Sequence, residues 1–341
     1  MTSPVEEHAR AVAELHTRLA AVRAEPDGTI FAEPSGGHFV TVTKEASNVL
    51  LWLMDQNADG SGVVQSELDV ENPLALVDPY TQAATLALLW APTPARIYTT
   101  GLGGGCLPTV LHHYFPMTHI QCVEIDACVV KAAQSCFGFQ PDHYLRVAVD
   151  DGRRWLEANP AAGNYDIMLF DAFLDNGYSP YKMATREFAE LCSQRLAPGG
   201  VVVLNLLYLG THYTERVKTM AAVFPHLYLL RMGEENDLLF ASQTPLPAAA
   251  ELRDLAMSIR RRHPFQFLFV RRAVKLIPLA QADLPAWGST PVLTDDAPPA
   301  DYFATMPSMA GPLSTPDPTA PCFCGSGLDY DHCHRCSPAG A

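Results

Sequence analysis

Residues 96–110 read RIYTTGLGGGCLPTV. An apolar run typical of a β-strand leads into four closely spaced glycines, and helical spacing follows them. Because glycine has no Cβ, such a turn lets the backbone approach a ligand closely, although a tight turn without a ligand would use glycines too. The pattern predicts a strand, a ligand-binding turn and a helix, with Gly101, Gly103, Gly104 and Gly105 at the turn.

Strand and helix patterns alternate on both sides of this turn. Five apolar runs between residues 96 and 207 alternate with helical stretches, and runs at 226–233, 236–242 and 265–270 are expected to complete a sheet. This alternation predicts an α/β fold with a doubly wound, mostly parallel sheet. Ligands of such sheets bind at the carboxyl ends of the strands, which is where the glycines stand.

The first part of the chain has a different pattern. A charged amphipathic helix is expected within residues 1–27, and four short β-rich runs follow between residues 28 and 68. Gly, Asn and Asp separate these runs, which predicts a small antiparallel β domain. We expect it to act as a front domain or lid. A helix over residues 73–90 then leads into the main sheet.

Composition limits the function classes. The chain has 341 residues, with 23 Lys and Arg against 37 Asp and Glu, for a formal net charge of −14. This balance disfavours nucleic-acid binding and favours cationic substrates such as polyamines, although an acidic surface that only maintains solubility would give the same charge. The sequence shows no signal-peptide h-region and no apolar run of membrane-span length, so we expect a cytoplasmic protein without a membrane partner.

Two acids follow the next strands. Glu124 ends the apolar run IQCVE, about twenty residues after the glycines, where a carboxylate can accept hydrogen bonds from both hydroxyls of a ribose. Asp151 follows the run LRVAVD, where an acid can accept a hydrogen bond from an adenine amino group. A solvated strand-end acid is the alternative for Glu124, and a helix N-cap is the alternative for Asp151. The sequence therefore predicts a nucleoside site.

Several stretches together resemble the spermidine/spermine synthase family, in its broader bacterial branch. They are GLGGGCLPTVL, VEID, DDGRRWL, YDIMLFDAF, TREFAELCSQRLAPGGVVVLNL and LTDDAPPADY. The resemblance covers roughly residues 60–305 and implies a methyltransferase-type Rossmann core behind a small β domain. It also implies decarboxylated S-adenosylmethionine, or S-adenosylmethionine itself, as the bound donor, a small-molecule amine as the acceptor, and a homodimer.

Transfer of an aminopropyl or methyl group from a sulfonium to an amine requires a neutral amine. With an ordinary pKa of about 10.4, neutrality at pH 7 costs roughly 4–5 kcal/mol, so a carboxylate that accepts the proton is expected. Asp171 ends the fourth strand of the main sheet, and Asp175 follows one loop turn later. The resemblance implies that Asp171 is the base and that Asp175 holds the amine. Either acid could instead cap a helix.

The resemblance also assigns residues from the front of the molecule. Tyr80 and Gln82 in DPYTQ, and Gln65 in VVQSE, are similar to family positions that line the donor and amine pocket. A hydrogen-bonding role in the core is the alternative for each of them. These residues complete the candidate site, with Tyr80 beside the catalytic acids and Gln65 beside the donor.

Two departures from the family pattern leave the reaction open. Spermidine synthases carry an acid in the glycine loop, G-G-G-D-G, that binds the aminopropyl amine, and Gly104 stands at the corresponding position. The family segment D-S-T-D-P is replaced by DAFLD over residues 171–175. The leading interpretation is an aminopropyltransferase-like enzyme. A methyltransferase on the same fold and a non-catalytic nucleoside-binding protein recruited through its tail are the alternatives.

The end of the chain predicts a metal site. Four of the nine cysteines lie in the last twenty residues, and CFCGSGLDYDHCH resembles the SEC-C zinc module. Cys322, Cys324, Cys333 and His334 would bind a structural zinc ion in tetrahedral geometry, with a disulfide pair as the alternative. The resemblance implies that the tail contacts a protein partner.

The predicted organisation has five segments. They are an N-terminal helix at 1–27, a small β domain at 28–73, a spermidine synthase-like Rossmann domain at 74–283, a segment with a TDD motif and a Pro-rich linker at 284–320, and a SEC-C zinc motif at 321–341.

Overall fold

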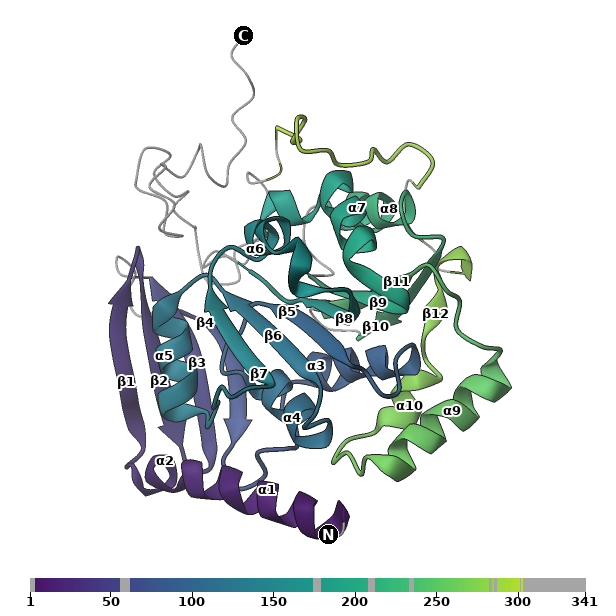
Figure 1. Cartoon of the computed structure of the whole chain (residues 1–341). Coiled ribbons are helices and arrows are strands. Elements are labelled where there is room, and N and C mark those ends of the chain that lie inside the picture. Colours follow the sequence, from purple (N-terminus) through teal and green to yellow (C-terminus); the bar gives the residue numbers. More distant parts are fainter. Residues whose placement is uncertain are drawn as a thin grey trace.

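The computed structural model describes residues 4–55, 62–173, 179–207, 212–232, 236–281, 284, 287–300 and 302. Two β-sheets form the framework of this part of the chain (Figure 1). A four-stranded antiparallel sheet stands beside an eight-stranded sheet that is mostly parallel. Across the described residues, no helix combines the length and the apolar character that a membrane crossing needs.

The antiparallel sheet is formed by residues 28–55 and 62–69 and confirms the expected small β fold. Two helices precede it, and Leu15 and Leu19 are buried in the core that they share with the rest of the molecule. The elements are α1 (Pro4–Arg18), α2 (Ala20–Ala24), β1 (Gly28–Ser35), β2 (His38–Glu45), β3 (Asn48–Asp55) and β4 (Gly62–Asp69). Helix α5 packs against β1 and β2, so this sheet lies directly against the larger unit (Figure 1).

The main sheet has the order β12-β10-β11-β9-β8-β5-β6-β7. Strands β5 to β9 run parallel, whereas β10, β11 and β12 add an antiparallel edge. The strands are β5 (Arg96–Thr100), β6 (His119–Glu124), β7 (Leu145–Val149), β8 (Tyr165–Phe170), β9 (Leu196–Leu207), β10 (His226–Arg231), β11 (Asn236–Ser242) and β12 (Ile277–Pro278). This arrangement confirms the predicted methyltransferase-type Rossmann fold.

Helices cover both faces of this sheet, as the doubly wound prediction requires. Helices α4, α5, α9 and α10 pack into one hydrophobic core, and α6, α7 and α8 pack into a second core on the opposite face (Figure 1). The helices are α3 (Pro79–Ala84), α4 (Cys106–Tyr114), α5 (Ala127–Cys136), α6 (Gly152–Ala158), α7 (Arg186–Arg195), α8 (Tyr213–Ala221), α9 (Ala249–Arg262) and α10 (Phe269–Ala273). The helix expected over 73–90 is shorter, because Thr85–Leu89 forms a 3-10 helix after α3.

The strand predicted at 265–270 is wrong. The alternating phenylalanines Phe265, Phe267 and Phe269 are all buried, but they stack on one another and on Tyr114. Because burial of alternate residues also arises in a compact turn, their spacing resembled that of a strand. The edge of the sheet is instead extended by β12, which pairs with β10.

The described residues between 287 and 302 pack against the main domain. This differs from the sequence prediction, which expected a Pro-rich linker within residues 284–320. Leu293 is 1% exposed, and its N–H donates to the Thr219 hydroxyl at 2.9 Å. The Arg153 guanidinium forms a bidentate pair with Asp295, at 2.7 and 2.6 Å. The TDD motif therefore anchors this segment to helix α6.

Gly101, directly after β5, lies close to the backbone of Asp171 at the end of β8. The Asp171 N–H donates to the Thr100 carbonyl at 3.0 Å, directly beside this glycine. Gly101 has φ +81°, and a Cβ at this position would lie 2.1 Å from the carbonyl oxygen of Asp171. The glycine is therefore a steric requirement of the sheet edge that carries Asp171.

We expect Gly101→Ala to lower the free energy of unfolding much more than Gly199→Ala. Gly199 has nearly the same φ, +82°, but open space around its Cβ position. The backbone penalty of about 1–2 kcal/mol is common to both variants, whereas the clash at Gly101 adds roughly 1–3 kcal/mol. Urea denaturation measures both losses. Equal losses would show that the close approach at Asp171 is unimportant.

Candidate active site

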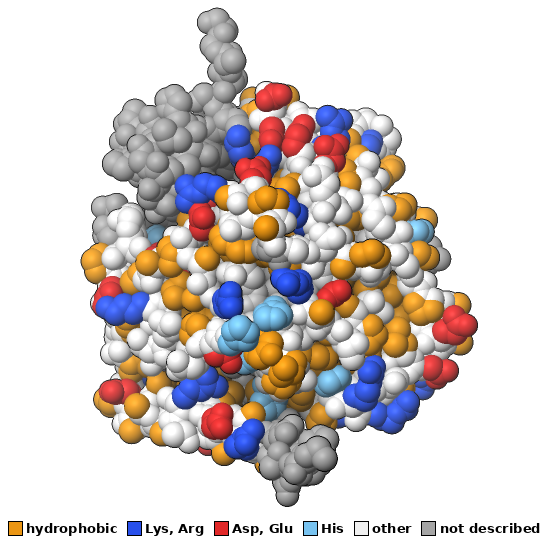
Figure 2. All heavy atoms as spheres, viewed as in Figure 1, with side chains coloured by type: hydrophobic (Ala, Val, Ile, Leu, Met, Phe, Trp, Pro, Cys, Tyr) orange, Lys and Arg blue, Asp and Glu red, His pale blue; other side chains and the backbone are white. Residues whose placement is uncertain are grey.

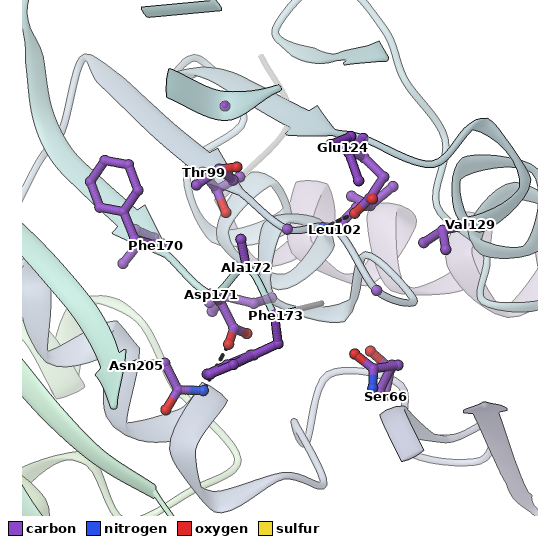
Figure 3. A pocket seen from close by; sticks show the side chains of 18 of the residues that line it. Ser66, Thr99, Leu102, Glu124, Val129, Phe170, Asp171, Ala172, Phe173 and Asn205 are labelled. Carbon is purple, nitrogen blue, oxygen red and sulfur yellow. Dashed lines mark hydrogen bonds between the residues drawn. The ribbon is translucent and has the colours of Figure 1, made fainter. Parts of the chain in front are cut away.

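A cavity of about 280 Å³ opens at the carboxyl ends of β5, β6 and β8. Its back wall comes from the main sheet, at Thr99, Glu124 and Asp171, and its front wall comes from the antiparallel sheet, at Gln65 and Ser66 (Figure 3). Two separate sheets thus enclose one cavity. The predicted front domain does form part of the site.

The four predicted glycines divide into two pairs. Gly101 and Gly103 line the cavity, whereas Gly104 and Gly105 lie against the rings of Phe137 and Phe139. The turn also contacts the front sheet: the Gly104 N–H donates to the Ser66 hydroxyl at 2.8 Å. Sequence reasoning missed Ser66, although it selected its neighbour Gln65, which also lines the cavity.

Glu124 is 8% exposed and is held by the backbone on both of its oxygens. Oε2 accepts the Leu102 N–H at 2.7 Å, and Oε1 accepts the Asp126 N–H at 3.0 Å. Burial raises the pKa of this carboxyl, and these hydrogen bonds oppose the rise. Because each carboxylate oxygen accepts more than one hydrogen bond, Glu124 keeps acceptor capacity for a diol in the cavity (Figure 3).

Asp151 has the structural role that was its alternative. Its Oδ1 accepts the Arg154 N–H at 2.8 Å and caps the N-terminus of α6, while the residue also lines the cavity. Asp150, which sequence reasoning missed, lines the cavity beside it and pairs with the Arg154 side chain. A carboxylate edge therefore borders this end of the cavity, next to β7.

Asp171 stands at the end of β8 in a small polar network. Asn205 donates to its Oδ1 at 2.7 Å, and Asn236 donates to the Asn205 side-chain oxygen at 2.8 Å (Figure 3). Burial raises the pKa of Asp171, and hydrogen bonds from Asn205 and from the Tyr80 hydroxyl oppose the rise. Asn205 was missed by sequence reasoning, although a polar residue inside the apolar run VVVLNLL was a usable signal.

Of the two residues that the resemblance assigned from DPYTQ, Tyr80 lies in the cavity lining and Gln82 does not. Tyr80 lines the cavity, and burial together with the charges of Asp171 and Asp78 raises its pKa well above the ordinary value. Gln82 is outside the cavity lining. Its amide donates to the Leu76 carbonyl at 2.6 Å and accepts from Arg272 at 2.8 Å, so it takes the core alternative.

Asp78 is a second cavity acid that the sequence did not single out. It precedes α3 without capping it, and its Oδ2 accepts the Glu67 N–H over a long 3.4 Å. Burial raises its pKa to about 6, and the negative charges of Glu67 and Asp171 add to the rise. The cavity therefore contains two carboxylates with raised pKa values in electrostatic contact.

The charged side chains that line the cavity are predominantly acidic. Its described lining includes six carboxylate side chains and no Lys or Arg; the acids are Asp78, Glu124, Asp126, Asp150, Asp151 and Asp171. On the face shown in Figure 2, by contrast, acidic and basic side chains are interspersed. The electrostatic preference for a cation is therefore a property of the cavity, and a phosphate-bearing dinucleotide would be repelled there.

Some predicted site residues cannot be placed. Asp175 and the four candidate zinc ligands, Cys322, Cys324, Cys333 and His334, lie outside the described residues. In the parts of the chain that are described, no group of three His, Cys, Asp or Glu side chains is arranged to hold a metal ion.

Comparison with protein families gives two matches. Residues 86–226 match the family described as "Spermine/spermidine synthase domain". This stretch of the chain is therefore similar to a spermine/spermidine synthase domain. This synthase domain contains the glycine turn, Glu124, Asp151 and Asp171. Residues 319–335 match the SEC-C motif, which confirms that resemblance in the tail.

Individual relatives of the synthase domain fall into two groups. A polyamine aminopropyltransferase of Vibrio vulnificus is 35% identical over 185 residues, which are 53% of this chain and 61% of that protein. The human eEF1A lysine and N-terminal methyltransferase is 31% identical over 222 residues, which are 60% of this chain and 31% of that protein. The chain thus spans about three fifths of the first relative and under one third of the second.

Solved structures agree with the fold. A probable spermidine synthase from Corynebacterium glutamicum has a TM-score of 0.59 at 20% identity and covers 83% of this chain and 100% of its own. Human methyltransferase-like protein 13 in complex with SAH has a TM-score of 0.51 at 28% identity and covers 55% of this chain and 93% of its own. Both kinds of transferase therefore share the architecture of the synthase domain.

We expect Asp78→Asn to stabilise the ligand-free protein at about pH 7.5. A carboxyl whose pKa is raised to about 6 on folding destabilises the folded state above that pH, by up to about 3 kcal/mol. The gain should shrink as the pH falls from about 6 to about 4, because protonation then removes the cost. Thermal unfolding across this pH range measures the effect.

Asp126→Asn is the matched control, and we expect it to lower the free energy of unfolding at about pH 7.5. Burial opposes the shift, but hydrogen bonds with His38 and Ser35 lower the pKa of Asp126. Its ionised form therefore stabilises the folded protein, and that contribution is lost as the pH falls. A loss of stability in Asp78→Asn at about pH 7.5 would contradict the electrostatic description of the cavity.

Proposed function

We propose that this protein transfers an aminopropyl group from decarboxylated S-adenosylmethionine to an amine acceptor. The observation that carries the proposal is the acidic cavity, in which Asp171 lies at the carboxyl edge of the sheet and no Lys or Arg belongs to the described lining. The donor carries a sulfonium and an ammonium, and the acceptor is also cationic, so an acidic cavity favours both. The aminopropyltransferase relatives support the same reaction.

The proposed step is an in-line displacement. The nitrogen of the neutral acceptor amine forms a bond to the carbon of the aminopropyl group that is attached to sulfur. The C–S bond breaks, and its electron pair stays on sulfur, which gives neutral methylthioadenosine. The proton released from the amine passes to the Asp171 carboxylate. A raised pKa makes this carboxylate a better proton acceptor.

The remaining residues have positioning roles in this proposal. Asn205 and Tyr80 orient Asp171 through their hydrogen bonds. Glu124 binds the ribose hydroxyls of the donor, and the Asp151 edge borders the adenine. Gly101 and Gly103 allow the nucleoside to approach the backbone. The front sheet closes the site from the other side and excludes water from the reacting atoms.

Methyl transfer from S-adenosylmethionine is the second candidate, and Gly104 favours it. The glycine loop lacks the acid that binds the aminopropyl amine in spermidine synthases. Several relatives carry the name eEF1A lysine and N-terminal methyltransferase. The two reactions leave different co-products, because aminopropyl transfer releases methylthioadenosine and methyl transfer releases S-adenosylhomocysteine.

Asp171→Asn tests the proposed base. We expect kcat for methylthioadenosine release to fall by roughly 10²–10⁴-fold, while the donor Kd changes little. Chromatography of the co-product with each donor and a set of diamines measures both the rate and the reaction type. S-adenosylhomocysteine as the sole co-product would overturn aminopropyl transfer and establish the second candidate.

Asp237→Asn is the matched control for this variant. Asp237 is also a buried acid that accepts a hydrogen bond from a tyrosine, Tyr213, at 2.8 Å, but it is not part of the cavity lining. Its replacement should leave kcat within about threefold of the wild-type value. If Asp171→Asn turned over as fast as this control, a different base would be favoured. A wild-type protein that gave no turnover would favour the nucleoside-binding alternative without catalysis.

We propose further that the SEC-C tail binds one structural zinc ion and serves as a docking element for a protein partner. The support is the motif match and the ligand types, since Cys and His in this spacing suit tetrahedral zinc. Four protein ligands would leave no open position, so the ion would not take part in the transfer. A homodimer and a cytoplasmic location remain predictions.

Cys324→Ser should lower the zinc content from about one ion per chain and leave kcat for the transfer unchanged, because the tail is separate from the proposed chemistry. Atomic absorption of the purified protein measures the metal. Cys128→Ser is the control, since Cys128 lies in the described core region near Glu33 and should not affect zinc. Unchanged zinc content in Cys324→Ser would contradict the proposed ligand set.

A further inference from the structure

The position of Gly104 cannot easily regain the acid that it lacks. A Cβ on Gly104 would lie 2.5 Å from Cδ1 of Phe137, and Phe137 itself is 2% exposed. The Gly104 N–H is already bound to Ser66. The ring of Phe137 thus fills the space behind the glycine turn. A carboxylate that contacts the donor arm must therefore come from another element.

Asp78 is placed to supply that carboxylate. It lies at the start of α3 and lines the cavity together with three groups around the expected reaction centre. One is Cys106, which directly follows the glycine turn; the others are Tyr80 and Asp171. Asp78 therefore shares one cavity with the glycine turn and with the proposed base.

The carboxylate of Asp78 is poorly compensated within the protein. In the described part of the chain it accepts one long hydrogen bond, from the Glu67 N–H at 3.4 Å, and no Lys or Arg lines the cavity around it. Its charged neighbours, Glu67 and Asp171, have the same sign. A buried charge in such surroundings is costly unless a cation pairs with it. A cationic group of a ligand would compensate this charge.

We propose that Asp78 binds the ammonium of the donor's aminopropyl arm and thereby selects decarboxylated S-adenosylmethionine over S-adenosylmethionine. This inference rests on the proposed aminopropyl transfer. The two donors differ at this arm, because the intact donor carries a carboxylate beside the ammonium. That carboxylate would face Asp78 and Asp171 and be repelled. Asp78 would thus perform, from another element, the task of the acid that is absent at Gly104.

Calorimetric titration of three nucleosides tests the inference. Decarboxylated S-adenosylmethionine carries the ammonium, S-adenosylmethionine carries the additional carboxylate, and methylthioadenosine lacks the arm. For Asp78→Asn we expect the Kd of the decarboxylated donor to rise roughly 10–100-fold, the discrimination against S-adenosylmethionine to narrow, and the Kd of methylthioadenosine to stay within about twofold.

Glu67→Gln is the matched control. Glu67 is an acidic residue beside Asp78. Its backbone N–H donates to the Asp78 carboxylate, and its side chain is not part of the described cavity lining. All three affinities should stay within about threefold of the wild-type values in this variant. Equal losses in both variants would show that general negative charge, and not Asp78, attracts the donor.

The outcomes separate the inference from the function on which it rests. If the wild-type protein prefers the decarboxylated donor and Asp78→Asn keeps that preference, the inference is overturned and the proposed function stands. A loss shared equally by all three nucleosides would reveal a purely structural role and also overturn it. A rise in the acceptor KM with unchanged donor affinity would assign Asp78 to the acceptor instead. A wild-type protein that binds none of the nucleosides, or prefers the intact donor, overturns the proposed function itself.

Discussion

Negative charge buried at the carboxyl edge of the main sheet is the constraint on which the site depends. Asp171 and Asp78 share a cavity whose described lining contains no Lys or Arg, and burial raises the pKa of both carboxyls. Such charges cost free energy in the ligand-free protein, because water has been removed without a compensating cation. A cationic ligand offsets this cost, so the fold itself favours a sulfonium or an ammonium over a phosphate.

Both sheets contribute to positioning these carboxylates and closing the cavity around them. The main sheet brings Asp171, Glu124 and the glycine turn to one edge, and close approach at Gly101 fixes the distance between β5 and β8. The antiparallel sheet closes the opposite wall, where Ser66 binds the glycine turn. A second contact joins Ser35 of the front sheet to Asp126, at 2.8 Å. Closure of the cavity therefore requires both sheets to be folded together.

Local patterns in the sequence predicted the framework well, since strand alternation and the glycine turn are properties of neighbouring residues. They also led to Glu124 and Asp171, because acids at strand ends meet at one edge of a parallel sheet. Asp78 lies outside such patterns: it matters only because the folded chain brings it to a cavity that other elements form. The strand-end pattern also led to Asp151, but in the structure this one residue both caps helix α6 and lines the cavity. The phenylalanines from 265 to 269 misled the strand prediction because burial alone does not distinguish a strand from a packed turn.

A crystal structure of the protein with decarboxylated S-adenosylmethionine bound tests the central claim most directly. We expect the adenosine to lie along the glycine turn with its ribose hydroxyls on Glu124, and the sulfonium and aminopropyl arm to extend toward Asp78 and Asp171. A donor bound outside this cavity, or an arm directed away from both acids, would contradict the claim that buried negative charge selects the ligand.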